Sequence, residues 1–368
     1  MICSKEIKSC LQNNWRKEHV KKFLIMIGVL IVAATMAIAL NYQKLENLIK
    51  HKNATNENLI TPEKVADNIY KLDYKGDYKL DDYLKAGINN LDDYDKWFMD
   101  NLTFGVSLNS GDPNAGCSSF SVVDENGNHL FARNYDMVKD DALLIRTTPK
   151  DGYKSIGIAD IGKAGIGEGQ KLKIDDKDSK KILNAAPYLM TDGVNEKGLG
   201  VSVLTLPEDF KLTDTDKPDL IIFSATRMIL DKCANVDEAV EMLKDYDIYC
   251  PGHHWYHLFI TDKSGKSVIT EWMDDEFYVV EDDVVTNFVL HDDKHSKDSD
   301  GRVARIRYAL EGKDVISKSE AMEVLSKARM TTCKTCWSVV YDLDDFLFDV
   351  CFYEDYNKKY SYSEKNFN

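Results

Sequence analysis

Two neighbouring stretches decide the fold: Gly116-Cys117-Ser118-Ser119-Phe120 and, a little downstream, Phe131-Ala132-Arg133-Asn134-Tyr135-Asp136. The turn-rich Glu125-Asn126-Gly127-Asn128 lies between them. An Asn-Gly pair flanked by apolar runs predicts a hairpin of two antiparallel strands. Such a hairpin brings Arg133 and Asp136 back to the start of the first strand, where Cys117 lies. A neighbouring cation can lower the pKa of a cysteine thiol and make it a nucleophile.

This spacing resembles a known family. Cys117 is followed by Arg133 after sixteen residues and by Asp136 after nineteen, in the contexts Cys-x-x-Phe and Ala-Arg-Asn-Tyr-Asp. The pattern is similar to the N-terminal-nucleophile hydrolases of the choloylglycine hydrolase and penicillin V acylase family, and to the related acid ceramidases and acyltransferases. The turn Asn195-Glu196-Lys197-Gly198 is a second signature of that family. The resemblance covers roughly residues 117 to 353.

The resemblance implies that Cys117 becomes the first residue of the mature chain and that its own α-amino group is the base. A free α-amine titrates near pH ~7.7–8.0, close to the working pH that suits a general base. Arg133 is then expected beside the thiolate, and Asp136 is expected to accept a hydrogen bond from the α-amino group. The loop residues 108–116 precede Cys117, and an exposed loop is easily cut.

The same resemblance assigns two residues further along the chain. Asn287, at the end of the strand-like Val284-Val285-Thr286-Asn287-Phe288, is expected to donate to the oxyanion of the tetrahedral intermediate. Such a donor contributes on the order of 3–4 kcal/mol to transition-state stability. Arg302, at the start of a predicted helix, is expected near the nucleophile, with Arg305 as the alternative. Thr205 stands where bile-salt hydrolases have Asn and penicillin acylases have Tyr, a residue that helps form the oxyanion hole. Its backbone N–H is still able to donate, but this departure from the pattern argues against both of those substrates.

The composition excludes some classes of partner. The chain has 368 residues, with 47 Lys and Arg against 62 Asp and Glu, for a net charge of −15. An acidic chain is a poor candidate for nucleic-acid binding. His253-His254-x-x-His257 lies in a strand context with no carboxylate motif, and Cys333-x-x-Cys336 is interpreted as part of a strand. The sequence therefore predicts no metal ion and no cofactor.

The N-terminal region predicts a membrane anchor. Residues 1–22 form a basic tail, and residues 23–40 are apolar without any charge. Eighteen helical residues span roughly 27 Å, near the ~30 Å thickness of the hydrocarbon core. A positive flank predicts a cytoplasmic N-terminus and an extracytoplasmic catalytic domain. The alternative is a secreted protein, cleaved as a signal peptide at Ala37-x-Ala39.

The remaining pattern predicts a stalk and pro-segment over 41–116 and a hydrolase domain over 117–368. Within the pro-segment, Thr61-Pro62 favours the start of a helix. Asn235 is expected to cap a helix over 236–243. Alternating groups of strands and helices predict an α+β layered body. The resemblance makes this body a four-layer αββα sandwich, preceded by a transmembrane helix and the pro-segment.

The predicted function is hydrolysis of a linear, non-peptide C–N amide in a small-molecule substrate, after cleavage between Gly116 and Cys117. Three alternatives stay open. The same site is suited to an acyltransferase. A papain-like thiol hydrolase would use His254 or His257 as its base. An inactive surface-bound binding protein is the third. The acyl and amine parts of the substrate are open, and so is the oligomeric state, a homo-oligomer included.

Overall fold

The computed structural model describes residues 21–22, 25–39, 41–42, 59–88, 90–108, 116–137, 141–206, 211, 213–249, 255–291 and 301–367. The chain divides into two units, Met1–Ala54 and Thr55–Asn368. In the first unit, residues 25–39 are helical, and Phe23, Leu24 and Leu40 of the predicted membrane-spanning stretch lie outside the described residues. Across the described part of the chain, no helix combines the length and the apolar character needed to cross a membrane.

The predicted hairpin lies inside a six-stranded antiparallel sheet of the second unit. Its turn at Asn126-Gly127 is held by Asp124, whose side chain accepts from the backbone N–H groups of Asn126 and Asn128. The strands, in order across the sheet, are β14 (Val284–Val285), β3 (Gly116–Val123), β4 (His129–Met137), β15 (Lys334–Asp342), β16 (Leu347–Phe352) and β17 (Lys359–Ser363).

A second sheet of nine strands packs against the first. Its strands, in order, are β1 (Glu63–Ala66), β2 (Ile69–Tyr74), β5 (Ala142–Thr147), β6 (Ser155–Asp160), β7 (Met190–Asn195), β8 (Leu199–Leu206), β11 (Trp255–Asp262), β12 (Ser267–Met273) and β13 (Glu276–Glu281). The pairing of β2 with β5 is parallel, and the other pairings in this sheet are antiparallel.

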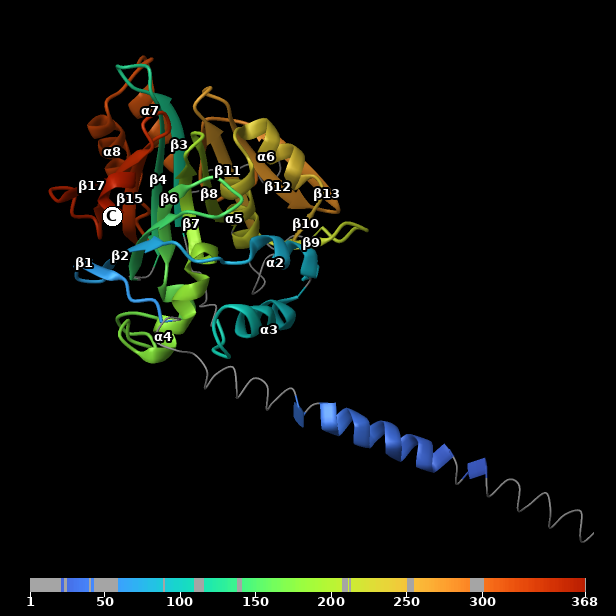
Figure 1. Cartoon of the computed structure of the whole chain (residues 1–368). Coiled ribbons are helices and arrows are strands. Elements are labelled where there is room, and N and C mark those ends of the chain that lie inside the picture. The colour runs from blue at the N-terminus through green and yellow to red at the C-terminus, as the bar shows by residue number, and fades with distance from the viewer. Residues whose placement is uncertain are drawn as a thin grey trace, which may run out of the picture. The chain divides into compact units, whose positions relative to one another are not determined.

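Helices cover the outer faces of the two sheets (Figure 1). On the nine-stranded sheet lie α5 (Ile222–Lys232) and α6 (Val236–Leu243), with the short parallel pair β9 (Asp219–Ile221) and β10 (Asp247–Tyr249) beside them. On the six-stranded sheet lie α7 (Arg302–Leu310) and α8 (Lys318–Lys327). The layers therefore follow the order helix, sheet, sheet, helix, with a separate apolar core between each pair of layers.

Side chains alternate between the two faces of the hairpin, as the pleat of a strand requires. Phe131 and Tyr135 belong to the core between the sheets, whereas Leu130 and Ala132 belong to the core beneath α7 and α8. Cys117 belongs to the inter-sheet core. This alternation decides which groups can reach the Cys117 side chain.

Residues 59–108 belong to the same compact unit as the predicted hydrolase domain. The predicted helix start at Thr61-Pro62 is wrong: Glu63–Ala66 is the edge strand β1, paired with β2. Proline has no N–H to give to a sheet, but it is tolerated where a strand at the edge begins. After β2, the chain forms α2 (Leu80–Ala86) and α3 (Leu91–Asn101).

Other predicted elements are confirmed in place. Asn235 caps α6, and its side chain accepts from the backbone N–H of Glu238. The chain ends with the hairpin of β15 and β16, which is extended by β17. The prediction also lacked α4 (Lys177–Ile182) and the short 3-10 turns Gly162–Ala164, Leu183–Leu189 and Glu364–Phe367.

Candidate active site

The candidate site lies at the end of the β3–β4 hairpin that is remote from its turn. Gly116 pairs with Asp136 across the hairpin, and Cys117 pairs with Tyr135. The Cys117 side chain is only 1% exposed, and Arg133 and Asp136 are fully buried. The thiol, the guanidinium and the carboxylate therefore all lie in the half of the hairpin that is remote from its turn.

Arg133 contacts the sulfur of Cys117. Its Nη2 donates to Sγ at 3.4 Å and to the carbonyl oxygen of Val203 at 2.7 Å. On its other side, Nε lies 3.1 Å from Oδ2 of Asp192 in an ion pair of two fully buried side chains. A buried charge is stabilised when it is paired and hydrogen-bonded. The guanidinium is thus fixed in place before any substrate arrives.

Asn287 contacts the backbone nitrogen of Cys117. That nitrogen donates to Oδ1 of Asn287 at 2.6 Å. Nδ2 of Asn287 donates to the carbonyl oxygen of Thr205 at 2.6 Å and to its hydroxyl at 3.1 Å. The sequence placed both residues near the nucleophile. In the uncut chain, however, the amide N–H groups of Asn287 are directed at Thr205.

Arg302 contacts the carbonyl oxygen of Cys117. Its Nη1 donates to this oxygen at 2.7 Å and lies 3.4 Å from Oδ2 of Asp136, while Nη2 donates to Oδ1 of Asn287 at 2.8 Å. Gly301 caps the start of α7 with a φ of 69°, a left-handed conformation that glycine adopts at little cost. Of the two arginines at the start of this helix, Arg302 is the one that bonds to Cys117.

Asp136 is held on the face of the sheet opposite the Cys117 side chain. The Thr335 hydroxyl donates to its Oδ1 at 2.5 Å. Burial raises the pKa of Asp136 to about 6, although the Thr335 hydroxyl and the Arg302 guanidinium favour the charged form. The carboxyl group therefore titrates near neutral pH rather than in the usual acidic range.

The thiol of Cys117 does not have the lowered pKa that a neighbouring cation was expected to give. Burial raises its pKa, and the opposing effect of Arg133 is smaller. Asp136 raises it further, whereas Lys163 and Arg302 lower it. In the uncut chain the thiol is thus kept neutral by exclusion of water.

Four further residues of this region were not singled out from the sequence. Asp192 orients Arg133 and is itself held by Trp337 Nε1 at 3.1 Å and by the Tyr341 hydroxyl at 2.6 Å. The sequence did contain a signal for Asp192, because this residue is charged and lies in a stretch that fits a buried strand. A buried charge needs a partner. The other three are Lys163, Glu271 and Thr335, which come from distant elements and left no local signal.

Of the alternative motifs, Cys333 reaches this arrangement, because its thiol is hydrogen-bonded to the backbone of Gly116 and interacts with Asp136. His257 is buried, and its Nδ1 lies 3.2 Å from Glu271, whereas His253 and His254 lie outside the described residues. Cys333 and Cys336 are free thiols. Among the residues that the structure describes, no group of three or more His, Cys, Asp and Glu side chains is placed to hold a metal ion.

Similarity to known proteins centres on the same region. Residues 117–296 match the linear amide C-N hydrolases, choloylglycine hydrolase family. The Penicillin V acylase of Pectobacterium atrosepticum is 37% identical over 95 residues, which are 23% of this chain and 25% of that protein. The chain thus spans about a quarter of the length of this curated relative.

Solved structures with similar folds include two from bacteria. A mutant of the conjugated bile acid hydrolase from Clostridium perfringens is 18% identical, with a TM-score of 0.47, over 68% of this chain and 93% of that one. Penicillin V acylase from Agrobacterium tumefaciens is 20% identical, with a TM-score of 0.42, over 64% of this chain and 83% of that one. Residues 117–296 of the chain are a domain of the linear amide C-N hydrolases, choloylglycine hydrolase family.

Proposed function

We propose that the chain is an amidohydrolase that cleaves linear, non-peptide C–N amide bonds with Cys117 as an N-terminal nucleophile. In this proposal the layered body is a four-layer αββα N-terminal-nucleophile hydrolase. One observation carries it. The sulfur, nitrogen and carbonyl oxygen of Cys117 each have a separate polar partner, namely Arg133, Asn287 and Arg302. In a cysteine that only fills space in a core, the thiol needs no guanidinium, and the backbone groups find their partners in the sheet rather than in polar side chains.

The first step is cleavage of the bond between Gly116 and Cys117. Sγ of Cys117 adds to the carbonyl carbon of Gly116, and the peptide C–N bond breaks with a proton transferred to the nitrogen. This leaves a thioester on Sγ and a free α-amine on the same residue. Water then hydrolyses the thioester, which releases a carboxylate at Gly116 and the thiol of Cys117. The position of Gly116 directly opposite Asp136 supports a carboxylate beside the new amine.

The second step uses the freed α-amine as the general base. It accepts the proton of the thiol while Sγ adds to the carbonyl carbon of the amide substrate. The resulting ammonium returns the proton to the leaving amine as the C–N bond breaks. Water then attacks the thioester and releases the acid. Arg133, 3.4 Å from Sγ, stabilises the developing thiolate.

Asn287 and Thr205 supply the polar groups for the oxyanion of the intermediate. The Nδ2 group of Asn287 donates to Thr205 in the uncut chain, so a hydrogen bond to the substrate has to replace one of these bonds. Arg302 fixes Oδ1 of Asn287 and thereby orients the amide. Loss of one such donor lowers kcat by roughly 10²–10³-fold in enzymes that stabilise an oxyanion.

The contacts of His257 weigh against a papain-like mechanism in which this residue is the base. His257 is held by Glu271, whereas the polar partners recorded for Cys117 are Asn287, Arg133 and Arg302. His254 lies outside the described residues. An acyltransferase would use the same thioester and pass the acyl group to an amine, so the reaction products with and without an added amine decide between the two activities.

The proposal is tested with a panel of N-acyl amides and processed protein. We expect release of the free acid by the wild type, and loss of at least 10²-fold in kcat for Asn287→Ala after confirmed processing. Cys117→Ala is expected to remain uncut and inactive. His257→Ala serves as the contrast. If His257 were a papain-like base, its removal would abolish hydrolysis. Correctly processed wild type that hydrolyses no amide of the panel would contradict the proposal.

A further inference from the structure

We propose that helix α3, upstream of the cleavage site, forms one wall of the subsite for the acyl part of the substrate, and that residues 59–108 stay bound in the mature enzyme. The acyl group that fits is uncharged and mainly apolar. This inference rests on the proposed function, because the acyl group is the part of the substrate that becomes bonded to Cys117.

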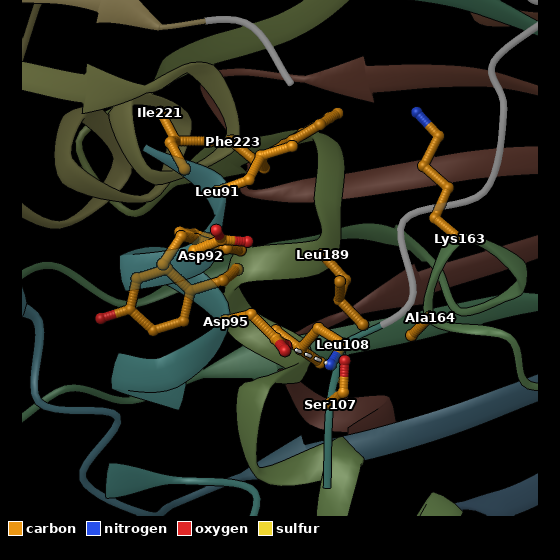
Figure 2. Close-up of a pocket in the computed structure, with 12 residues that line it drawn as sticks. Leu91, Asp92, Asp95, Ser107, Leu108, Lys163, Ala164, Leu189, Ile221 and Phe223 are labelled. Carbon is orange, nitrogen blue, oxygen red and sulfur yellow. Dashed lines mark hydrogen bonds between the residues drawn. The ribbon is translucent and has the colours of Figure 1, made fainter. Parts of the chain in front are cut away.

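A pocket of about 290 Å³ separates α3 from the hydrolase body. Figure 2 shows the side chains of α3 on one side of this pocket and Lys163 on the other. Its lining residues are Leu91, Asp92, Tyr94, Asp95, Ser107, Leu108, Lys163, Ala164, Tyr188, Leu189, Ile221 and Phe223. The volume is at the low end of the range of about 300–1,000 Å³ for small-molecule sites. A medium-sized group therefore fits it better than a large one.

Two series of side-chain contacts connect the pocket with the candidate active site. Lys163 lies with its ammonium 5.7 Å from the ring centre of Tyr135, the residue paired with Cys117, and its charge lowers the pKa of the Cys117 thiol. On the other side, the Phe223 ring contacts the Tyr256 ring, with 5.7 Å between their centres. Tyr256 pairs with Thr205, which holds Asn287. Lys163 and Phe223, which line the pocket, thus connect it through one further residue each to Cys117 and to Thr205.

The charges of the pocket favour an uncharged occupant. Asp92 and Asp95 of α3 line it, and Asp95 accepts from the backbone N–H of Leu108 at 2.7 Å. Two carboxylates oppose an anionic acyl group. The ammonium of Lys163 is directed at aromatic rings, 4.7 Å from the centre of the Phe223 ring. The remaining lining is largely aliphatic and aromatic, as in sites that bind apolar ligands.

The segment that carries α3 is bound to the body by contacts that do not depend on the peptide bond at residue 116. Strand β2 pairs along its length with β5. Tyr83 and Phe98 pack against the buried Tyr188 ring, with ring centres 5.5 and 4.9 Å apart. The Tyr78 hydroxyl donates to Asp231 at 2.6 Å. Burial of each large aromatic side chain stabilises the association by roughly 1.5–3 kcal/mol.

The test uses processed full-length protein and a series of amides that share one amine and differ in acyl length, from acetyl to hexadecanoyl. Leu91→Trp fills the pocket from α3, so we expect the kcat/KM ratio of long to short acyl groups to fall by at least tenfold. Leu91→Ala enlarges the pocket and is expected to shift the preference towards longer groups. Lys96→Trp, an equally large change on α3 outside the pocket, is the control and keeps the wild-type ratio.

Native mass spectrometry of the same samples checks the second part. We expect one species whose mass is the sum of the N-terminal fragment and the chain that begins at Cys117. Loss of the N-terminal fragment without loss of activity, or an unchanged acyl preference in both Leu91 variants, would overturn the inference while leaving the proposed function in place. Processed protein that hydrolyses no amide of the series overturns both.

Discussion

Among single residues, Asp136 is distinctive because it is a fully buried carboxyl group beside the bond that we propose is cut. It pairs with Gly116 across the hairpin, and Arg302 and Thr335 contact its two oxygens. Burial nevertheless raises its pKa to about 6. Between pH ~3.9 and ~6 the folded chain therefore holds a proton that the unfolded chain has released. Folding takes up this proton, so the stability of the uncut chain falls as the pH rises through this window.

The first prediction concerns this proton. In a Cys117→Ala background, which stays uncut, we expect Asp136→Asn to remove a pH-dependent loss of stability on the order of 3 kcal/mol between pH 4 and pH 7. The free energy of unfolding in urea, measured at both pH values, checks this. A carboxyl with an ordinary pKa would give the same difference between the two variants at both pH values, and that result would contradict the assignment.

The residues of the candidate site that could be predicted from the sequence are those in one hairpin or at recognisable ends of helices and strands. Cys117, Arg133 and Asp136 lie within twenty residues of each other, and one turn signal was enough to bring them together. Asp192 was not predicted as the partner of Arg133, because their contact depends on how two sheets stack. How the two sheets stack leaves no local signal in the sequence.

At the scale of elements, the segment that carries Asn287 is fixed by the side chain of Glu271 from β12. Its Oε1 accepts from the backbone N–H of Leu290 at 3.0 Å, and its Oε2 accepts from the backbone N–H of His291 at 3.1 Å. Nδ1 of His291 lies 2.7 Å from the same Oε2. Burial opposes the charged form of Glu271, but its contact with His257, together with those from Leu290 and His291, lowers its pKa to about 2. The carboxylate thus anchors the backbone shortly after Asn287, at Leu290 and His291.

We therefore predict that Glu271→Gln slows both processing and amide hydrolysis by roughly tenfold or more. A glutamine presents an NH2 group where one carboxylate oxygen now accepts hydrogen bonds, so Asn287 loses its fixed position. The rate at which a chain beginning at Cys117 appears is the measurement, with thermal unfolding as the check on folding. Glu276→Gln, an exposed change on the next strand, is the control. Equal rates in the two variants would rule out this role for Glu271.

Elements with their own end signals were predicted well, and elements defined by pairing were not. The helix capped by Asn235 was found because its cap and its apolar spacing agree. The strand at Glu63–Ala66 was mistaken for a helix because Thr61-Pro62 fits a helix start equally well. Only the partner strand β2 decides between the two readings.

In the molecule as a whole, the compact body extends upstream of Cys117. The compact unit begins at Thr55, and β2 adds to the nine-stranded sheet through a parallel pairing with β5. Ile69 and Ala142 are partners in this register, far apart in the sequence. Such a long-range pairing leaves no local signal. The placement of the catalytic unit outside a cytoplasmic membrane stays a prediction from the charges of residues 1–22 and the apolar residues 23–40.

This arrangement predicts the effect of removing the upstream segment. A chain produced to begin at Cys117, without residues 55–116, leaves the aromatic surface around Tyr188 and one edge of β5 uncovered. We expect it to be insoluble or to unfold at a much lower denaturant concentration, and co-expression of residues 55–116 to restore it. The midpoint of urea unfolding measures both effects. A stable, active chain without this segment would show that the segment is dispensable.

The proposed chemistry requires one residue that supplies both the thiol and the amine. Intact-mass analysis with N-terminal sequencing of the catalytically active protein is the decisive measurement. We expect the active species to have a chain beginning at Cys117, and Cys117→Ala to yield only the uncut chain. Full activity in protein whose bond between Gly116 and Cys117 is intact would contradict this chemistry, because no α-amine would then exist at Cys117.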